Sequence, residues 1–284
     1  MSCKNCISKS NGIPRGCNNN GACTSNSCNT FTVFDWLNDI TASDDKTMFP
    51  FCEVRFKNGR KGYYKTNSIL LSIGNVVATQ VEKGHDVGVI TLLGELVRIQ
   101  MKKKNINYES GDALGIYRIA SQKDIDVWQI SRDKEEAVKV RARKLALKLE
   151  LKMKISDVEY QGDGSKIIFY YTADDRVDFR ELIKLFAREF KSRIEMKQVG
   201  LREEASRLGG IGSCGRELCC STWLHDFRAV NTSSARYQQL SINPAKLSGQ
   251  CGKLKCCLNY ELGTYLEALK YIPRKEIKIK TKKG

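Results

Sequence analysis

Histidine is scarce in this sequence. The 284 residues include two, His85 and His225. A Ser–His–Asp catalytic arrangement and a mixed Cys/His metal site both depend on imidazole. The sequence therefore gives no support for a hydrolase of that class, and any metal site is expected to be all-thiolate. We expect His85 to be a turn residue in KGHDVG and His225 to lie on a surface helix.

Long apolar runs are also missing. No stretch approaches 18 consecutive apolar residues, so no membrane-spanning helix is predicted. The first 20 residues contain no apolar segment of the kind that a secretory signal requires. Twelve cysteines without an export signal are typical of the reducing cytoplasm, and we predict a cytoplasmic protein.

Motifs for common cofactors and for base recognition are absent. The stretch GGIGSCG at 209–215 has several glycines, but it leads into a cysteine-rich loop and no acidic ribose partner follows it. No motif of interleaved aromatic and basic residues supports sequence-specific reading of bases. We assign no catalytic residue and predict that the protein is not an enzyme.

Acidic residues are too few to balance the basic ones. Lysine and arginine number 48 against 32 aspartates and glutamates, a formal charge of +16. A positive chain attracts polyanions, so RNA is a possible partner through the basic surface, although no binding residues can be assigned. The alternative is a solvated, lysine-rich surface. Basic residues cluster at 102–104, at 139–148 and in the tail PRKEIKIKTKKG at 273–284.

The strongest positive feature is a cysteine repeat. Residues 214–220 read CGRELCC, and 37 residues later 251–257 read CGKLKCC. Each copy has one Cys, a Gly, three further residues and two adjacent Cys. The predicted metal ligands are the six cysteines of the repeat: Cys214, Cys219, Cys220, Cys251, Cys256 and Cys257.

Two half-sites with at least two thiolates each suit a tetrahedral metal ion or a four-thiolate iron–sulfur cluster. Spacing alone leaves zinc and iron–sulfur open. The glycines would let the backbone turn around an ion, and Arg216, Lys253 and Lys255 would offset negative charge. Disulfides and free buried thiols are the alternatives, but adjacent cysteines are poor bridge partners and the chain lacks the short format of secreted scaffolds.

The predicted fold class is α+β. We expect a small antiparallel β-barrel-like domain, then an α/β sandwich, then a duplicated Cys-rich metal module. The predicted segments are a disordered Cys-rich tail at 1–48, a small β domain at 49–125, an α+β domain at 126–200, the duplicated cysteine module at 201–272 and a basic tail at 273–284.

Local patterns carry this division. The tail is rich in Asn, Ser and Gly and holds Cys3, Cys6, Cys17, Cys23 and Cys28, of which the first two have metal-ligand spacing. FCEVRFKNGRKGYY alternates and turns at Asn58-Gly59, which predicts a hairpin. Glycines then separate further predicted strands at 75–82, 87–93 and 95–101.

The next segment predicts a helix, two strands, a helix and a strand. Ser131 is expected to open the first helix, and strands are expected near 154–161, 166–172 and 193–200. In the second helix, at 178–193, one face carries the apolar residues Phe179, Leu182, Ile183, Phe186 and Phe190. A further amphipathic helix is expected at 258–272.

The cysteine segment resembles a known family. RLGGIGSCGRELCCSTWLHDF at 207–227 and ARYQQLSINPAKLSGQCGKLKCCLNYE at 235–261 look like the signature of the RicT (YaaT) family of bacterial cytoplasmic proteins. The likeness extends upstream through 158–187 and covers about residues 50–270. The Cys-rich N-terminal tail departs from the better-known members.

The resemblance implies a non-enzymatic iron–sulfur regulator. Family members act with two small helical partners, RicA and RicF, in a complex linked to RNase Y-dependent mRNA processing and to developmental control such as sporulation. The resemblance also favours a four-iron four-sulfur cluster over zinc. With one ligand from each adjacent pair, the first choice is Cys214, Cys219, Cys251 and Cys256. The remaining pair could serve a cluster shared with a partner. The alternatives are a zinc-stapled nucleic-acid-binding protein and a cysteine-based redox enzyme.

Overall fold

The structure is a computed structural model that describes residues 9–10, 13–14, 33, 49–67, 69–106, 113–225 and 227–272. Its contacts divide the chain into two compact units, with the boundary between Gly200 and Leu201. We call the described residues up to Gly200 the first unit and keep the name cysteine module for 201–272. The five tail cysteines and the basic tail at 273–284 lie outside the described residues. In the segment predicted to be disordered, β1 (Lys9–Ser10) pairs with β2 (Ile13–Pro14).

The first unit begins with a five-stranded sheet in which every neighbouring pair is antiparallel. The predicted hairpin at Asn58-Gly59 is confirmed, because both residues have positive φ (52° and 72°) and join two paired strands. The spatial order is β4-β3-β6-β5-β7. The strands are β3 (Phe51–Arg55), β4 (Lys61–Lys65), β5 (Val76–Gln80), β6 (His85–Leu93) and β7 (Ile116–Ile119).

This sheet is not the closed barrel that the strand pattern predicts. Its edge strands β4 and β7 approach each other at one parallel bridge, between Lys65 and Gly115, and pair no further. A barrel needs a full ladder at that seam. His85 is also placed differently from the prediction, since it is the first residue of β6 and its Nε2 lies 3.7 Å from Asp124 Oδ1.

The predicted strand at 95–101 is wrong. This segment is helix α1 (Glu95–Lys103), which follows Gly94 with its positive φ of 69°. Leu96, Val97 and Met101 are buried with residues of β3 and β6, at a spacing that a helix places on one side. A segment that glycine spacing predicts to be a strand therefore folds as a helix after Gly94.

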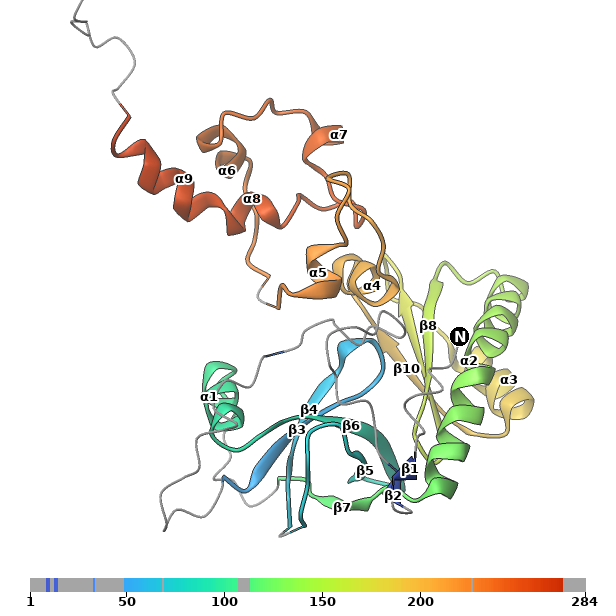
Figure 1. The fold of residues 1–284 in the computed structure, drawn as a ribbon. Helices are drawn as coiled ribbons and strands as arrows, with labels where there is room; N and C mark the ends of the chain where they lie inside the picture. Colours follow the sequence, from blue (N-terminus) through green and yellow to red (C-terminus); the bar gives the residue numbers. More distant parts are fainter. Residues whose placement is uncertain are drawn as a thin grey trace, which may run out of the picture. The chain divides into compact units, whose positions relative to one another are not determined.

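A three-stranded sheet follows in the first unit, and the predicted order of helices and strands is confirmed. Strand β9 (Lys166–Thr172) pairs antiparallel with β8 (Lys154–Tyr160) and parallel with β10 (Arg193–Gln198). Helices α2 (Gln122–Lys148) and α3 (Arg180–Phe190) lie on the same face of this sheet (Figure 1). The buried core between them consists of Val138, Ala142, Ala146, Ile155, Val158, Ile167, Phe169, Leu182 and Phe186.

Helix α2 begins nine residues before the predicted start at Ser131. Its N-cap is Ser121, whose side chain accepts from the Asp124 backbone while the Asp124 carboxylate accepts from the Ser121 backbone. Ser131 is instead buried within the helix. Because α2 runs from 122 to 148, the predicted boundary between 125 and 126 lies inside its first turn.

Buried ion pairs join the two sheets of the first unit. Lys57, in the turn of the β3–β4 hairpin, lies 2.8 Å from carboxylate oxygens of both Glu135 and Asp157. Arg60 lies 2.8 Å from both Asp86 and Glu159. Each cation is therefore shared by two carboxylates. Breaking one partner of such a buried network costs about 3–5 kcal/mol, because a charge is left buried without a counter-ion.

The cysteine module consists of short helices and loops. Its apolar cluster has three buried residues, Ala235, Leu247 and Leu258. The predicted helix at 258–272 is interrupted at Glu261, so two helices stand in its place. The helices are α4 (Leu201–Leu208), α5 (Cys219–Thr222), α6 (Thr232–Tyr237), α7 (Pro244–Leu247), α8 (Cys257–Tyr260) and α9 (Leu262–Leu269). Across the described part of the chain, no helix combines the length and the apolar character needed to cross a membrane.

Candidate metal centre in the cysteine module

The two cysteine phrases fold into the same loop twice. Three backbone hydrogen bonds of the first loop recur 37 residues later in the second, with donor–acceptor distances that differ by 0.1 Å. The matching pairs are Gly212 N to Arg216 O (2.7 Å) with Gly249 N to Lys253 O (2.8 Å), Gly215 N to Gly212 O (2.9 Å) with Gly252 N to Gly249 O (3.0 Å), and Leu218 N to Gly210 O (3.0 Å) with Lys255 N to Leu247 O (2.9 Å). The sequence repeat is therefore also a repeat of backbone geometry.

Glycine is required at the turn of each loop. Gly215 and Gly252 have φ values of 77° and 72°, a left-handed conformation that residues with a Cβ rarely adopt. A second glycine makes room for sulfur, because a Cβ on Gly212 would lie 3.3 Å from Cys214 Sγ. In the second copy the corresponding distance, from a Cβ on Gly249 to Cys251 Sγ, is 3.8 Å, an ordinary contact, so the tight fit belongs to the first loop.

The adjacent cysteines begin the short helices that follow. Cys219 is the first residue of α5, whereas Cys256 is the N-cap of α8. Trp223 and Tyr260, also 37 positions apart, touch edge to face with ring centroids 4.6 Å apart. The two halves therefore meet through equivalent positions.

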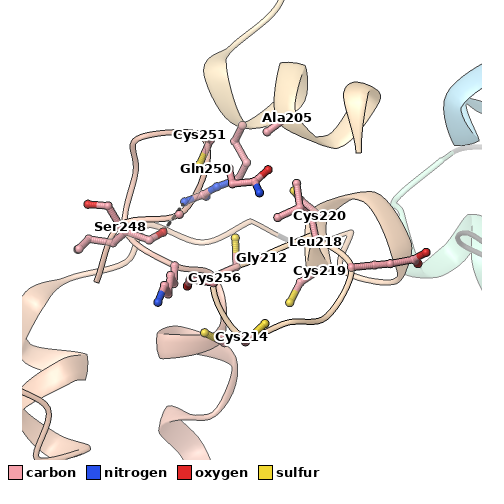
Figure 2. Close-up of a pocket in the computed structure, with 17 residues that line it drawn as sticks. Ala205, Gly212, Cys214, Leu218, Cys219, Cys220, Ser248, Gln250, Cys251 and Cys256 are labelled. Atoms are coloured by element: carbon pink, nitrogen blue, oxygen red, sulfur yellow. Dashed lines mark hydrogen bonds between the residues drawn. The ribbon is translucent and has the colours of Figure 1, made fainter. Parts of the chain in front are cut away.

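All six cysteines of the repeat line one cavity of about 370 Å³ (Figure 2). Cys220 is buried and Cys214 is exposed, while the other four are partly buried. Within the part of the chain that the structure describes, no three His, Cys, Asp or Glu side chains converge closely enough to hold a metal ion. The structure brings the predicted residues around one cavity, and their role as ligands stays a prediction.

Burial and neighbouring cysteines raise the pKa of four of these thiols, those of Cys219, Cys220, Cys256 and Cys257. Burial is the largest cause at Cys220, and together with the nearby Cys256 and Cys251 it raises the pKa of that thiol to about 11. The pKa of Cys219 is raised by burial and then by Cys256. Thiolates formed on both halves at once would repel each other across the cavity. A bound cation would remove that repulsion, and its binding would release protons.

Charge near the cavity comes from residues outside the repeat as well as within it. Of the basic residues predicted to offset charge, Lys255 lines the cavity, whereas Arg216 and Lys253 are exposed and do not. Arg202 of α4 also lines it, and its positive charge opposes the rise that burial causes in the pKa of Cys256. The cysteine repeat does not point to Arg202, because this residue lies before the first copy and is not part of its spacing.

His225 and Cys52 are not among the residues that line the cavity. His225 follows α5 in an exposed loop and does not line the cavity, so the predicted helical placement is wrong. Cys52 is fully buried in β3, where its Sγ lies 3.6 Å from the Tyr64 carbonyl oxygen. Burial raises its pKa to about 12, as expected for an inert structural thiol.

Known proteins match this chain in two regions. Residues 115–199 match the PSP1 C-terminal conserved region, and residues 229–272 match the third domain of PSP1-like proteins. The chain is 38% identical to the stage 0 sporulation protein YaaT of Bacillus subtilis over 234 residues, which cover 80% of each chain.

Two yeast proteins are similar over shorter stretches. An uncharacterised protein of Schizosaccharomyces pombe is 28% identical over 189 residues, or 56% of this chain and 24% of that protein. Protein PSP1 of Saccharomyces cerevisiae is 45% identical over 47 residues, or 16% of this chain and 6% of that protein. No solved structure matches. The match to the Bacillus protein along most of both chains shows that this chain belongs to the YaaT (RicT) family of PSP1-domain proteins.

Proposed function

We propose that this protein is a non-enzymatic regulatory subunit whose cysteine module holds an iron–sulfur cluster. The observation that supports the proposal most directly is the single cavity lined by six cysteines from two equivalent loops. Inorganic clusters of the four-iron type take four thiolate ligands, and the repeat offers a matched set from each side.

We propose a cluster rather than one zinc ion on the family resemblance. The cavity of about 370 Å³ is large enough to admit either group, so its size does not choose between them. We keep Cys214, Cys219, Cys251 and Cys256 as the proposed ligands. Of the remaining pair, Cys257 is partly exposed and suits a shared site or oxidation, whereas Cys220 is buried.

The thin core of the module also supports a bound metal. Among its described residues, the buried apolar side chains are Cys220, Ala235, Leu247 and Leu258. Folding units of this size usually need a metal, disulfides or a partner to be stable. Without metal, the two cysteine loops would lose the ligand bonds that join them, and any partner surface built on them would be lost.

The relatives suggest what the regulation concerns. The Bacillus relative is named as a stage 0 sporulation protein, which supports a role in developmental control. On the family resemblance, we propose a cytoplasmic complex with RicA- and RicF-like proteins that acts in RNase Y-dependent mRNA processing. The net charge of +16 is compatible with RNA at that complex.

Metal analysis of the purified protein tests the proposal. The full chain would be purified without oxygen, and its absorption spectrum and its content of iron, acid-labile sulfide and zinc would be measured. Iron and sulfide in equal amounts with a broad visible absorption are expected. Stoichiometric zinc in a colourless protein would defeat the cluster and favour the zinc-stapled nucleic-acid-binding alternative, whose RNA affinity should fall steeply with salt.

A further inference from the structure

Arg202 is the cation that reaches the six-cysteine cavity from outside the repeat. It is the second residue of α4, which precedes the first cysteine loop. Its Nη2 donates to the Leu254 carbonyl oxygen of the second loop at 3.3 Å, and its guanidinium lies 5.5 Å from the Phe227 ring centroid. Arg202 therefore spans from one half of the module to the other and is held on both sides.

The second half has no matching arginine. The position 37 residues after Arg202 is Gln239, which has a positive φ of 55°, follows α6 and does not line the cavity. One guanidinium, that of Arg202, therefore lines the cavity formed by two equivalent cysteine loops. The backbone of the two loops is symmetric, whereas the positive charge beside them is not.

One donor of this guanidinium is unused. The Nε–H of Arg202 is buried and has no hydrogen-bond partner among the described residues. Proteins rarely leave a buried charged donor without an acceptor, since it has lost water and gained nothing in exchange. The Nη2 bond to Leu254 and the contact with the Phe227 ring hold the side chain that carries this Nε–H, and the side chain lines a cavity rich in sulfur.

We propose that Arg202 is a positioning residue that donates its Nε–H to a negatively charged sulfur of the group bound in the cavity, either a metal-bound thiolate or an inorganic sulfide. This proposal rests on the proposed metal centre. It adds Arg202 as a hydrogen-bond donor to the sulfur of the bound group. A hydrogen bond from a cation to such a sulfur stabilises the more negative, reduced state of a cluster. It also holds the second loop against the first while the metal is bound.

The test uses the full chain, loaded with iron and sulfide without oxygen. Arg202→Gln removes charge and donor, and Arg202→Lys keeps the charge but lacks Nε. Arg207→Gln is the matched control, because Arg207 lies in the same helix, has a side chain 10% exposed and does not line the cavity. The readouts are the reduction potential and the rate at which iron passes to a ferrous chelator.

Both Arg202 variants should lower the reduction potential, and Arg202→Gln should speed iron loss by about 10- to 100-fold, the usual effect of removing an outer-sphere partner. Arg207→Gln should match the wild type. Unchanged values in both Arg202 variants, or an equal change in Arg207→Gln, would overturn the inference. If Arg202→Gln does not fold, Arg202→Lys carries the test. A wild-type chain that binds no iron would instead defeat the proposed function. If that chain binds zinc, the rates of zinc release from the wild type and from the same variants would test the role of Arg202.

Discussion

The two units of this chain keep their folds by different means. The first unit buries large side chains such as Phe169, Phe186 and Tyr170 and ties its two sheets together with buried ion pairs. The cysteine module buries one small apolar cluster and surrounds a cavity with thiols. Amphipathic packing explains the first unit without any added group, whereas the second has the composition of a unit that needs one. The comparison predicts that the two units respond to different perturbations.

The largest effect should come from the cysteines. Changing Cys214 and Cys251 together to Ser should remove most bound metal, because one ligand is lost from each half-site. Structural zinc supplies about 10–16 kcal/mol to the folding of small metal domains, and we expect a comparable dependence here. Metal analysis and limited proteolysis would show metal loss with cleavage confined to 201–272.

Cys52→Ala is the control for this experiment, since Cys52 is a buried thiol of the first unit. It should leave metal content unchanged. Equal metal loss from Cys52→Ala would mean that the metal site has been misplaced. A cysteine module that stays folded in the Cys214/Cys251 double variant would contradict the claim that this module depends on bound metal.

A core substitution in the first unit should give the opposite pattern. Phe186 is fully buried, with its ring centroid 4.5 Å from that of Phe169. Phe186→Ala should lower the free energy of unfolding of the first unit by about 3–5 kcal/mol through lost burial and a cavity. Denaturant unfolding measures this loss, and metal content should not change. Leu147→Ala, at a position 73% exposed in α2, should stay within about 0.5 kcal/mol of the wild type.

A smaller effect is expected at the cap of α2. The Ser121 side chain accepts from the Asp124 backbone, so Ser121→Ala should cost about 1 kcal/mol of first-unit stability. Ser121→Thr keeps the hydroxyl that accepts from the Asp124 backbone and donates to the Asp124 carboxylate, and should retain most of that stability. If Ala and Thr at this position proved equally stable, the helix would not depend on its cap.

The smallest effect is a change in the pH dependence of stability, which is separate from the pH-independent loss of about 3–5 kcal/mol expected when a partner in the buried ion-pair network is removed. Burial raises the pKa of Asp86 above 3.8 even though Arg60 lies 2.8 Å away, because that guanidinium is shared with Glu159. The folded state then keeps a proton that the unfolded chain loses, so stability falls as pH rises from about 4 through the raised pKa. Asp86→Asn removes this titration and should flatten that part of the curve. Urea unfolding across pH would show it, and an unaltered slope would assign the dependence to other groups.

Some of this architecture follows directly from short sequence signals. The Asn58-Gly59 turn and the phenylalanines of α3 are local patterns whose chemistry allows few alternatives. The cysteine repeat likewise indicated which side chains would surround one cavity.

The features that were missed depend on longer-range packing. Residues 95–101 read as a strand because their helical burial appears only against β3 and β6. The closed barrel was predicted wrongly, because the number of strands does not determine whether the edge strands β4 and β7 pair along their length. Arg202 could not be found from the repeat, since its place at the cavity is set by α4 and by the Leu254 carbonyl of a loop 52 residues away.

The two equivalent cysteine loops are joined in one polypeptide, and this determines how the cavity assembles. If the halves were separate chains, each would have to find its partner, and occupancy would depend on protein concentration. A short linker instead gives each loop an effective concentration of the other in the millimolar range. Trp223 and Tyr260 can then meet by closure within the chain. The thiol cavity should therefore form as readily in a cell that contains few copies of the protein as in one that contains many.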